Sequence, residues 1–392
     1  MAKNKKIKGG KIDGNSRKIK VLQISSDSNI GGAGKCIITF LKNYNRDRFD
    51  VCAIVPRGSL LKPEMEETGT KVLEADKIAE KSLSIGGIRE ICKIIKKVKP
   101  DIVHTHGSMS GRIAAKLCGV KVVFTRHSVF EPSPKISKGI GKKINGFINN
   151  AAADEIIAVA EAAKDNLTAT GVSEKKITVI LNGVLPLEKY DDEKRRLTRE
   201  KLGISQSCKA AAIVARLNPV KGHLYYVRAA KKVIDRGIDA KFFIAGTGEC
   251  ENEIREEIER LNLKDNVIML GFLSDVEPLM NAVDLQINCS FGTEATSLSL
   301  LEGMSVGTPA VVTDFGGNPG VIEDGKNGFL VPIKNPEKMA DKIAEIFEND
   351  ELLKTLSQNA EAVYKEKFTQ KVYTENIEAV YERNGGHKNE QA

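Results

Sequence analysis

The sequence predicts an α/β protein built from two doubly wound parallel sheets. Short apolar runs bounded by turn residues alternate with helical patterns along the chain, which is typical of parallel sheets covered on both faces. The chain has 392 residues, more than a single hydrophobic core usually supports. A turn-rich passage at residues 182–186 separates the apolar runs into two sets. We therefore expect two domains, with ligands at the carboxyl ends of the strands.

The first set of apolar runs begins with an expected strand at residues 20–25. Further strands of this set are expected at residues 51–55, 102–105, 122–125, 156–160 and 177–181. The second set comprises residues 211–215, 242–245, 267–270, 285–288, 310–313 and 329–331. We place the domain boundary near residue 188. The predicted parts of the chain are a basic disordered tail at 1–18, domains at 19–188 and 189–367, and a terminal segment at 368–392.

Composition favours a cytoplasmic protein without disulfides. The net charge is +8, but eight basic side chains against Asp13 lie within residues 1–20, so the body is nearly neutral and nucleic-acid binding is not expected. Seven cysteines are scattered without a Cys-x-x-Cys pair, as for buried thiols in a reducing compartment. No secretory leader is recognised, and no run reaches the roughly 18 apolar residues of a membrane span.

Two glutamates carry the first functional signal. Glu294 and Glu302 lie eight positions apart, and on one continuous helix they would face in different directions. The pair is better explained if Glu294 sits on a loop and residues 296–299 open a helix, whose free N–H groups suit a phosphate. Carboxylates accept hydrogen bonds from sugar hydroxyls. The segment therefore predicts a site for a sugar nucleotide.

Two cations lie upstream of these glutamates. Arg216 ends an apolar strand, and Lys221 precedes a long helical pattern. Together they form a clamp suited to a departing diphosphate. Either cation alone is more simply explained as a surface charge, so the prediction depends on their combination with Glu294 and Glu302.

These segments together resemble the retaining GT-B glycosyltransferases of family 4, over residues 19 to 383. The matching motifs lie at residues 214–217, 221–222, 245–249, 270–272, 294–302 and 316–319. The family usually has Gly where this chain has Ala295, and Glu where it has Gly320. The resemblance implies a GT-B fold of two facing Rossmann-like domains, with a C-terminal helix that crosses back onto the N-terminal domain and is followed by a polar tail.

The resemblance also implies roles for individual residues. The acceptor is expected in residues 19–188 and the nucleotide sugar in residues 189–367. Arg216 and Lys221 would stabilise the leaving diphosphate, Glu294 would bind the transferred hexose, and Glu302 the ribose. Further donor-binding residues are expected to be Gly246, Gly248, Gly271, Phe272, Thr296, Ser297 and Leu298. No cofactor is expected, and the family is commonly metal-independent.

The N-terminal domain offers a glycine-rich turn and a histidine. Gly32 lies in Gly-Gly-Ala-Gly-Lys after the first strand, where N–H groups can face a phosphate, although a close helix-to-strand turn explains the pattern equally well. The turn lacks the spacing of a P-loop, and no dinucleotide fingerprint follows the strand. His127 ends a strand, and the resemblance implies contact with the transferred sugar. His104 and His106 are interpreted as cleft or core residues.

Residues 135–151 predict a basic amphipathic helix. Ile136, Ile140, Ile144, Phe147 and Ile148 recur at helical spacing among lysines. Packing of this stripe on its own domain is the simpler expectation. The alternative is that the helix, with the basic tail, rests on an anionic membrane.

The sequence thus predicts a retaining glycosyltransferase that moves a hexose from a nucleotide-diphospho-sugar to a saccharide or lipid-linked hydroxyl acceptor. Synthesis of cell-envelope polysaccharide or glycolipid is the expected setting, in the cytoplasm or at the inner face of the plasma membrane. Two alternatives are a nucleotide-sugar epimerase of the same fold and a catalytically silent scaffold. The base, hexose and acceptor are not determined by the sequence.

Overall fold

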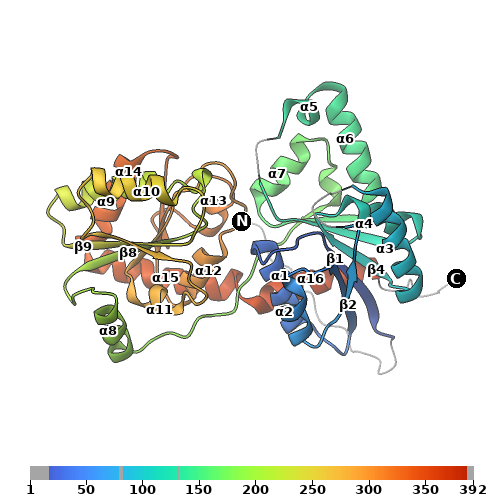
Figure 1. Ribbon diagram of the computed structural model, residues 1–392, viewed down its shortest axis with the longest axis horizontal. Helices are drawn as coiled ribbons and strands as arrows, with labels where there is room; N and C mark the ends of the chain where they lie inside the picture. Colours follow the sequence, from blue (N-terminus) through green and yellow to red (C-terminus); the bar gives the residue numbers. More distant parts are fainter. Residues whose placement is uncertain (1–16, 79–82, 130–131, 386–392) are drawn as a thin grey trace.

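The computed structural model describes residues 17–78, 83–129 and 132–385, and it confirms the α/β class with two parallel sheets (Figure 1). Helices cover both faces of each sheet, and the two layered units stand side by side (Figure 1). Most of the expected basic tail, residues 1–16, lies outside the described residues, as does the end of the polar tail at residues 386–392.

The N-terminal sheet has seven parallel strands in the order β3-β2-β1-β4-β5-β6-β7. The strand β3 was not predicted from the sequence, because Lys71 and Glu74 interrupt its apolar character. This strand pairs only with β2 at the edge of the sheet. The strands are β1 (Ile19–Ser25), β2 (Phe49–Pro56), β3 (Lys71–Ala75), β4 (Ile102–His106), β5 (Lys121–Arg126), β6 (Glu155–Ala158) and β7 (Ile177–Val179).

The C-terminal sheet has six parallel strands in the order β10-β9-β8-β11-β12-β13. These are β8 (Lys209–Val214), β9 (Ala240–Ala245), β10 (Val267–Gly271), β11 (Leu285–Asn288), β12 (Ala310–Thr313) and β13 (Gly328–Val331). In both sheets the strand order reverses, between β1 and β4 and between β8 and β11. Such switch points open a crevice at the carboxyl ends of the strands.

The connecting helices follow the expected alternation. Those of the N-terminal domain are α1 (Gly32–Asn43), α2 (Leu61–Glu67), α3 (Ile85–Val98), α4 (Met109–Leu117), α5 (Pro134–Ser137), α6 (Gly139–Ala152) and α7 (Glu161–Ala169). Those of the C-terminal domain are α8 (Asp192–Lys201), α9 (His223–Asp235), α10 (Glu251–Arg260), α11 (Glu277–Ala282), α12 (Leu298–Ser305), α13 (Asn318–Val321), α14 (Pro336–Phe347) and α15 (Asp350–Lys367).

The last helix, α16 (Gln370–Gly385), returns from the C-terminal domain and packs on α1 and β1, as expected for a crossover helix (Figure 1). Its inner face is apolar and includes Ile377 and Val380, both fully buried. Each such side chain contributes about 1.5–3 kcal/mol on burial. Tyr381 meets the rings of Phe40 and Phe49 edge-on, with centroids 5.6 and 5.8 Å apart. The helix thereby fastens the end of the chain to the N-terminal core.

The basic helical segment is oriented opposite to the simpler expectation. It forms two helices, α5 and α6, and α6 packs inward through small and amide side chains. Asn145 donates to the carbonyl of Thr170 at 2.8 Å, and a Cβ at Gly146 would lie 2.2 Å from the carbonyl oxygen of Gly171. The apolar stripe therefore points outward, with exposed fractions of 75% for Ile140 and 76% for Phe147. The expectation that this stripe packs on its own domain was wrong.

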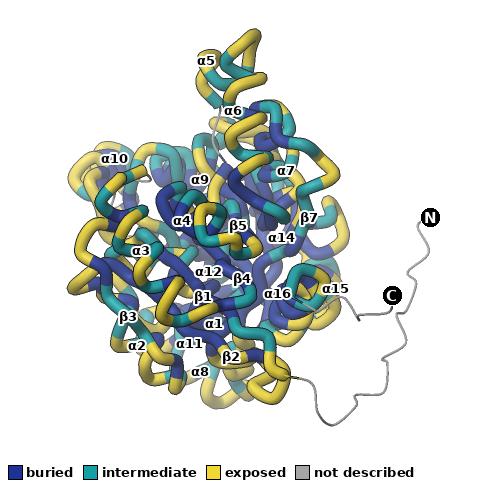
Figure 2. Tube along the Cα trace, turned by 90° about the vertical axis from the view of Figure 1, so that its right-hand side faces the viewer, coloured by how far each residue is buried: buried dark blue, intermediate teal, exposed yellow. Residues whose placement is uncertain are grey.

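The outward face of α6 also includes Ile144 and Ile148, 54% and 44% exposed. Residues 132–152 carry four lysines and no acidic residue. In Figure 2, α5 and α6 project from the body of the molecule and show largely exposed residues. None of the helices in the described part of the chain combines the length and apolarity that crossing a bilayer requires.

Candidate functional site

A cavity of about 660 Å³ lies between the two domains at the carboxyl ends of both sheets. Its walls come from the turns after β1 and β5 on one side and from the loops after β8, β9, β10 and β11 on the other. Eleven of the predicted site residues line it, namely Gly32, His127, Arg216, Lys221, Gly246, Phe272, Glu294, Thr296, Ser297, Leu298 and Glu302. Motifs up to 270 residues apart in the sequence thus meet around one space.

Glu294 lies on the loop between β11 and α12 and is 6% exposed. Its Oε2 accepts from Lys221 Nζ at 2.7 Å, Ser290 Oγ at 2.8 Å and Asn288 Nδ2 at 3.2 Å. Its other carboxylate oxygen has no hydrogen-bond donor among the described residues. Because one oxygen holds the side chain in place, the other can accept a hydrogen bond from a hydroxyl of a ligand.

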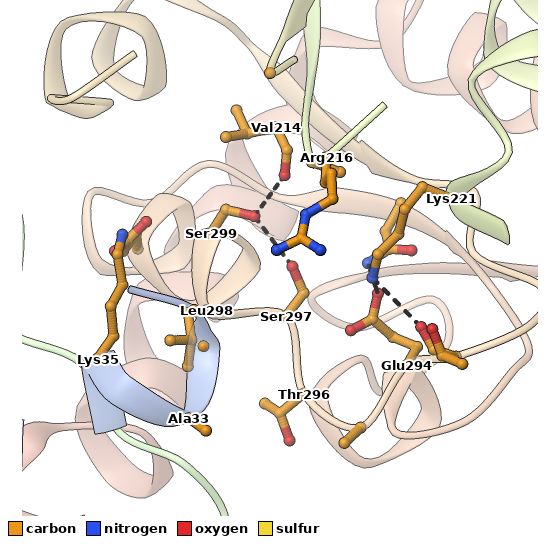
Figure 3. Close-up of a pocket in the computed structure, with 18 of the residues that line it drawn as sticks. Ala33, Lys35, Val214, Arg216, Lys221, Glu294, Thr296, Ser297, Leu298 and Ser299 are labelled. Atoms are coloured by element: carbon orange, nitrogen blue, oxygen red, sulfur yellow. Dashed lines mark hydrogen bonds and ion pairs between the residues drawn. The ribbon is translucent and has the colours of Figure 1, made fainter. Parts of the chain in front are cut away.

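Lys221 owes its position to the residue that follows it. Gly222 has φ +73, and a Cβ there would lie 2.3 Å from the carbonyl oxygen of Cys289. Only glycine fits this turn, which ends the short helix at Pro219–Lys221 and aims the lysine at Glu294 (Figure 3).

Arg216 projects into the cavity from the loop that follows β8 (Figure 3). Its guanidinium makes no ion pair or hydrogen bond within the described ranges, and the residue is exposed. A free guanidinium beside an ammonium group provides two positive charges on one wall. Both can meet a diphosphate, with the planar fork of Arg216 suited to two oxygens at once.

The first turn of α12 faces the same space. Ser297 precedes this helix, but its side chain does not cap it; its Oγ lies 3.0 Å from Ser299 Oγ, which donates to the carbonyl of Val214 at 2.9 Å (Figure 3). The first N–H groups of a helix lack intrahelical acceptors. The start of α12 therefore offers donors and a positive dipole end for an anion.

Glu302, one turn into α12, accepts no hydrogen bond through its side chain in the described part of the molecule. Burial raises its pKa, the positive charge of Lys35 partly opposes this rise, and Asp275 adds to it. A half-buried carboxylate without hydrogen-bond donors around it can accept hydrogen bonds from the hydroxyl groups of a ligand. Lys35 enters the cavity from α1 on the opposite wall (Figure 3). Lys35 was not predicted as a site residue, although its position directly after a glycine-rich turn is a signal that could have identified it.

Gly248 and Gly271 are not among the residues that line the cavity, and their expected contact with the nucleotide stays a prediction. Gly248 has φ +159, and a Cβ there would meet the carbonyl oxygen of Leu217 at 2.3 Å. Gly271 has φ +70 and accepts a hydrogen bond from the N–H of Gly246 at 2.7 Å. The positive φ angles of both glycines determine the path of the loops next to the cavity. Gly246 and Phe272 do reach the space, and Phe272 is 74% exposed at its rim.

The two domains touch directly at the glutamate loop. Thr296 donates through its hydroxyl to the carbonyl of Val159 at 3.0 Å, and Ala295 is 6% exposed within the N-terminal core. The methyl group by which Ala295 differs from the family pattern therefore lies in this contact between domains.

His127 lies at the end of β5 and leads into a chain of buried hydrogen bonds. Its Nε2 is 2.8 Å from Nδ1 of His106, whose Nε2 is 2.5 Å from Oε1 of Gln23. The amide of Gln23 donates to Tyr381 Oη at 2.9 Å, and that hydroxyl lies 2.6 Å from Nδ1 of His104. The expected cleft or core histidines thus form a chain from the cavity to α16.

The amide of Gln23 determines the direction of these hydrogen bonds. Because its Oε1 can only accept, His106 carries its proton on Nε2 and accepts at Nδ1 from Nε2–H of His127. Nδ1 of His127 is then left as an acceptor. Burial lowers the pKa of His127 to about 4, and burial with the charge of His127 lowers the pKa of His104 to about 3. Burial also lowers the pKa of His106 well below its ordinary value, so all three imidazoles are neutral near pH 7.

The turn at Gly31–Lys35 serves both packing and the cavity. A Cβ at Gly34 would lie 2.4 Å from a methyl group of Leu61, so this glycine permits α1 to pack on α2. At Gly32 nothing lies within 4 Å of an added Cβ, since that position faces the open cavity. Within the described residues no group of three His, Cys, Asp or Glu side chains could hold a metal ion.

Comparisons with known proteins agree with this geometry. Residues 194–363 match the family described as Glycosyl transferases group 1, and residues 30–186 match Glycosyltransferase Family 4. The chain is 32% identical over 278 residues to UDP-Gal:alpha-D-GlcNAc-diphosphoundecaprenol alpha-1,3-galactosyltransferase of Escherichia coli, covering 68% of this chain and 71% of that one. It is 25% identical over 303 residues to N-acetyl-alpha-D-glucosaminyl L-malate synthase of Bacillus anthracis, covering 74% and 77%.

Solved structures show the same fold. The chain superposes on HepE of Anabaena, crystallised with UDP, with a TM-score of 0.81 at 22% identity over 93% of this chain and 100% of that one. A glycosyltransferase of Rickettsia africae gives a TM-score of 0.81 at 23% identity over 95% and 100%.

Proposed function

Starting from a chain that belongs to glycosyltransferase family 4 and has the GT-B fold, we propose that it transfers a hexose from a nucleotide-diphospho-sugar to a hydroxyl acceptor. Family membership makes it a glycosyltransferase with a nucleotide-sugar donor. The hexose, the retention of anomeric configuration and a role in cell-envelope polysaccharide or glycolipid synthesis are the proposed part. The observation that carries the proposal is the meeting of Arg216, Lys221 and the start of α12 around one cavity.

Departure of the diphosphate is the step that this arrangement favours. As the bond from hexose C1 to the diphosphate oxygen breaks, negative charge grows on that oxygen, and the bond from the acceptor oxygen to C1 forms. Arg216 and Lys221 are assigned to that charge, together with N–H groups of Thr296, Ser297 and Leu298. The net reaction releases the proton of the acceptor hydroxyl. We assign no metal ion or cofactor, because the two cations supply the positive charge.

The sugar and nucleoside are assigned to the carboxylates and the loops. Glu294, with one oxygen held and one open, is assigned to the hexose hydroxyls, and Glu302 to the ribose. His127 is assigned to a hydroxyl of the transferred sugar, because its Nδ1 can accept a hydrogen bond from that hydroxyl. Gly246 and Phe272 are assigned to the base. Retention of configuration rests on the motif resemblance to retaining members of the family.

The acceptor of a relative and the exposed face of α6 are the reasons to propose a contact with a membrane. The Escherichia coli relative acts on a sugar carried by diphosphoundecaprenol, a lipid. In this chain, α6 exposes four apolar side chains, and residues 132–152 carry four lysines and no acidic residue. Each lysine near an anionic surface contributes about 1 kcal/mol, and buried apolar area adds to this. We assign this face to the anionic inner surface of the plasma membrane, next to a lipid-linked acceptor.

Donor binding tests the proposal first. UDP-, GDP-, ADP- and TDP-sugars are compared by thermal shift on the wild type, on Lys221→Ala and on Lys264→Ala. Lys264 is a control, since its side chain is 66% exposed and, within the described residues, its ion pair is with Glu259 alone. A ligand at 100 times its Kd stabilises by about 2.7 kcal/mol. We expect one donor to shift the wild type and the control, with the shift lost in Lys221→Ala.

Turnover separates the proposal from its alternatives. Transfer of the sugar to an acceptor, with release of the nucleoside diphosphate, supports it. Release of an epimerised free sugar without acceptor indicates an epimerase. No shift with any donor contradicts the proposal and favours a silent scaffold.

A further inference from the structure

A second cavity, of about 390 Å³, lies inside the N-terminal domain beside His127. It opens at the carboxyl ends of β1, β4 and β5, and it shares Ala33, His127 and Ser128 with the donor cavity. A molecule in this space lies next to the same His127 that lines the donor cavity. The cavity therefore has the position of an acceptor site.

Arg112 is the unusual residue of this cavity. It lies in the first turn of α4, and it is 4% exposed. Its guanidinium stacks on Phe124, 4.1 Å from the ring centroid, and Nη1 donates to Asn149 Oδ1 at 3.0 Å. Within the described ranges, its Nε has no hydrogen-bond partner and no carboxylate forms an ion pair with it.

This environment is energetically unfavourable for the positive charge of Arg112. A buried charge without a counter-ion destabilises a protein, and the positive end of a helix dipole adds to this destabilisation. Burial first, and the neighbouring charge of Arg126 second, lower the pKa of Arg112 to about 10, so the group remains charged at neutral pH. Among the described residues around Arg112, the missing component is an anion.

The rest of the wall suits a phosphate. Arg126, half-buried at the end of β5, brings a second guanidinium to the cavity, and it donates from Nε to the carbonyl of Ser128 at 3.0 Å. Hydroxyl groups of Ser25, Ser26 and Ser28 are part of the lining. Among the described lining residues one carboxylate is present, that of Asp27, which is exposed and accepts from the N–H of Asn29 at 3.1 Å. The two arginines outnumber this single acid.

We propose that this cavity binds a phosphate group of the acceptor, with Arg112 as its principal contact. The inference rests on the proposed function and adds the substrate class: a phosphorylated sugar whose hydroxyl is presented at His127. Arginine binds phosphate through paired N–H donors. The same chemistry is found in a soluble sugar phosphate and in a lipid-linked sugar phosphate. Asn149, which holds Arg112, belongs to α6, so the phosphate cavity and the outward apolar face share one helix.

Phosphate binding can be measured apart from the donor site. The protein is saturated with the nucleoside diphosphate that the donor screen identifies, so that Arg216 and Lys221 are occupied, and it is then titrated with inorganic phosphate by calorimetry. We expect one phosphate to bind the wild type, at least 10-fold weaker binding in Arg112→Met, and an intermediate value in Arg112→Lys, which keeps the charge and loses the fork.

The control variant is Arg89→Met, because Arg89 is an exposed arginine of α3 outside both cavities. It should bind phosphate as the wild type does. Retained nucleotide binding in Arg112→Met shows that this variant is folded. Equal phosphate binding in Arg112→Met and the wild type, or none in either while the nucleotide still binds, overturns the inference and leaves the proposed function intact. A wild type that binds no nucleoside diphosphate contradicts the proposed function instead.

A transfer assay separates the two sources of phosphate. The acceptors are a neutral hexoside, the same hexose 1-phosphate in solution, and that hexose joined through diphosphate to a polyprenol in vesicles. We expect Arg112→Met to lower kcat/KM at least 10-fold with the phosphorylated acceptors only. Activity with the vesicle acceptor alone assigns the site to a lipid-linked phosphate, and activity with the soluble one assigns it to a free sugar phosphate. Preference for the neutral hexoside, unchanged in Arg112→Met, overturns the inference.

Discussion

Lys221 and Glu294 form an ion pair, with Nζ 2.7 Å from Oε2, although they are 73 positions apart in the chain. The exposed fractions of the two side chains are 21% and 7%. Lys221 follows β8 and Glu294 follows β11, and these strands are neighbours at the switch point of the C-terminal sheet. The sheet topology therefore creates the pair, and the pair positions a cation and a carboxylate at one point of the cavity.

Replacing either partner should lower transfer strongly. For Lys221→Met we expect kcat to fall by about 10²–10³, because one donor to the departing diphosphate is removed. Glu294→Gln should reduce kcat/KM as well, since the amide provides one carbonyl oxygen and leaves Lys221 without its counter-charge. Steady-state kinetics of both variants and the double variant measure the coupling. Fully additive losses would contradict a direct pair, and Lys264→Ala serves as the control.

Tyr381→Phe tests the hydrogen-bond chain behind His127. The ring packing against Phe40 and Phe49 stays, but Gln23 and His104 lose their partner. We expect a loss of about 1–3 kcal/mol in the free energy of unfolding, which is typical of a buried polar group left unsatisfied. We also expect kcat to fall more than KM changes, because the orientation of His127 is no longer determined.

Tyr373→Phe is the matched control on the same helix. Tyr373 is 3% exposed, and its hydroxyl has no hydrogen bond within the described residues. In Tyr381→Phe the acidic limb of the pH–rate profile should move toward the ordinary histidine pKa, whereas in Tyr373→Phe it should stay in place. Equal profiles for the two variants would show that the chain has only a structural role.

Stability should decrease as the pH falls from about 6.5 toward 4. Burial lowers the pKa of His104 to about 3 and those of His127 and His223 to about 4. Histidine in an unfolded chain titrates near 6.5, so in this window the unfolded chain binds protons that the folded protein does not. The free energy of unfolding then falls with decreasing pH. At pH 5 each group contributes about 2 kcal/mol to this loss.

Urea unfolding at pH 7 and pH 5 measures this pH dependence. His223→Leu removes one titrating group that lies outside the His127 chain, and its loss of stability on acidification should be smaller than that of the wild type. A wild type that is equally stable at both pH values would contradict the buried neutral histidines.

The exposed face of α6 predicts binding to anionic vesicles. At low ionic strength the wild type should float with vesicles that contain anionic lipid and stay in solution with neutral ones, because lysine attraction and apolar insertion are both required. Phe147→Asp should abolish flotation. Ile85→Asp is the control, since Ile85 is 71% exposed but lies on α3. A wild type that remains in solution with anionic vesicles at low salt excludes this contact.

Sequence patterns were sufficient for most of the fold. Strands buried on both faces appear as continuous apolar runs, so nearly every strand of both sheets could be located. The edge strand β3 was missed because it pairs on one side only, and Lys71 and Glu74 are tolerated there. Whether Gly248 and Gly271 line the cavity could not be predicted, because a motif shows which backbone positions need glycine but not which side of the loop faces the cavity.

By itself, the sequence determined the alternation of strands and helices, the family and the chemical types that meet in the donor cavity. These depend on local patterns and on short motifs at strand ends, which a parallel sheet always gathers at one edge. Only the tertiary structure decided which face of α6 turns outward, how His127 connects to Tyr381 and that Arg112 is buried without a carboxylate partner in the described part of the chain. Each of these results from packing between segments far apart in the chain, where the partner determines the burial and charge of a side chain.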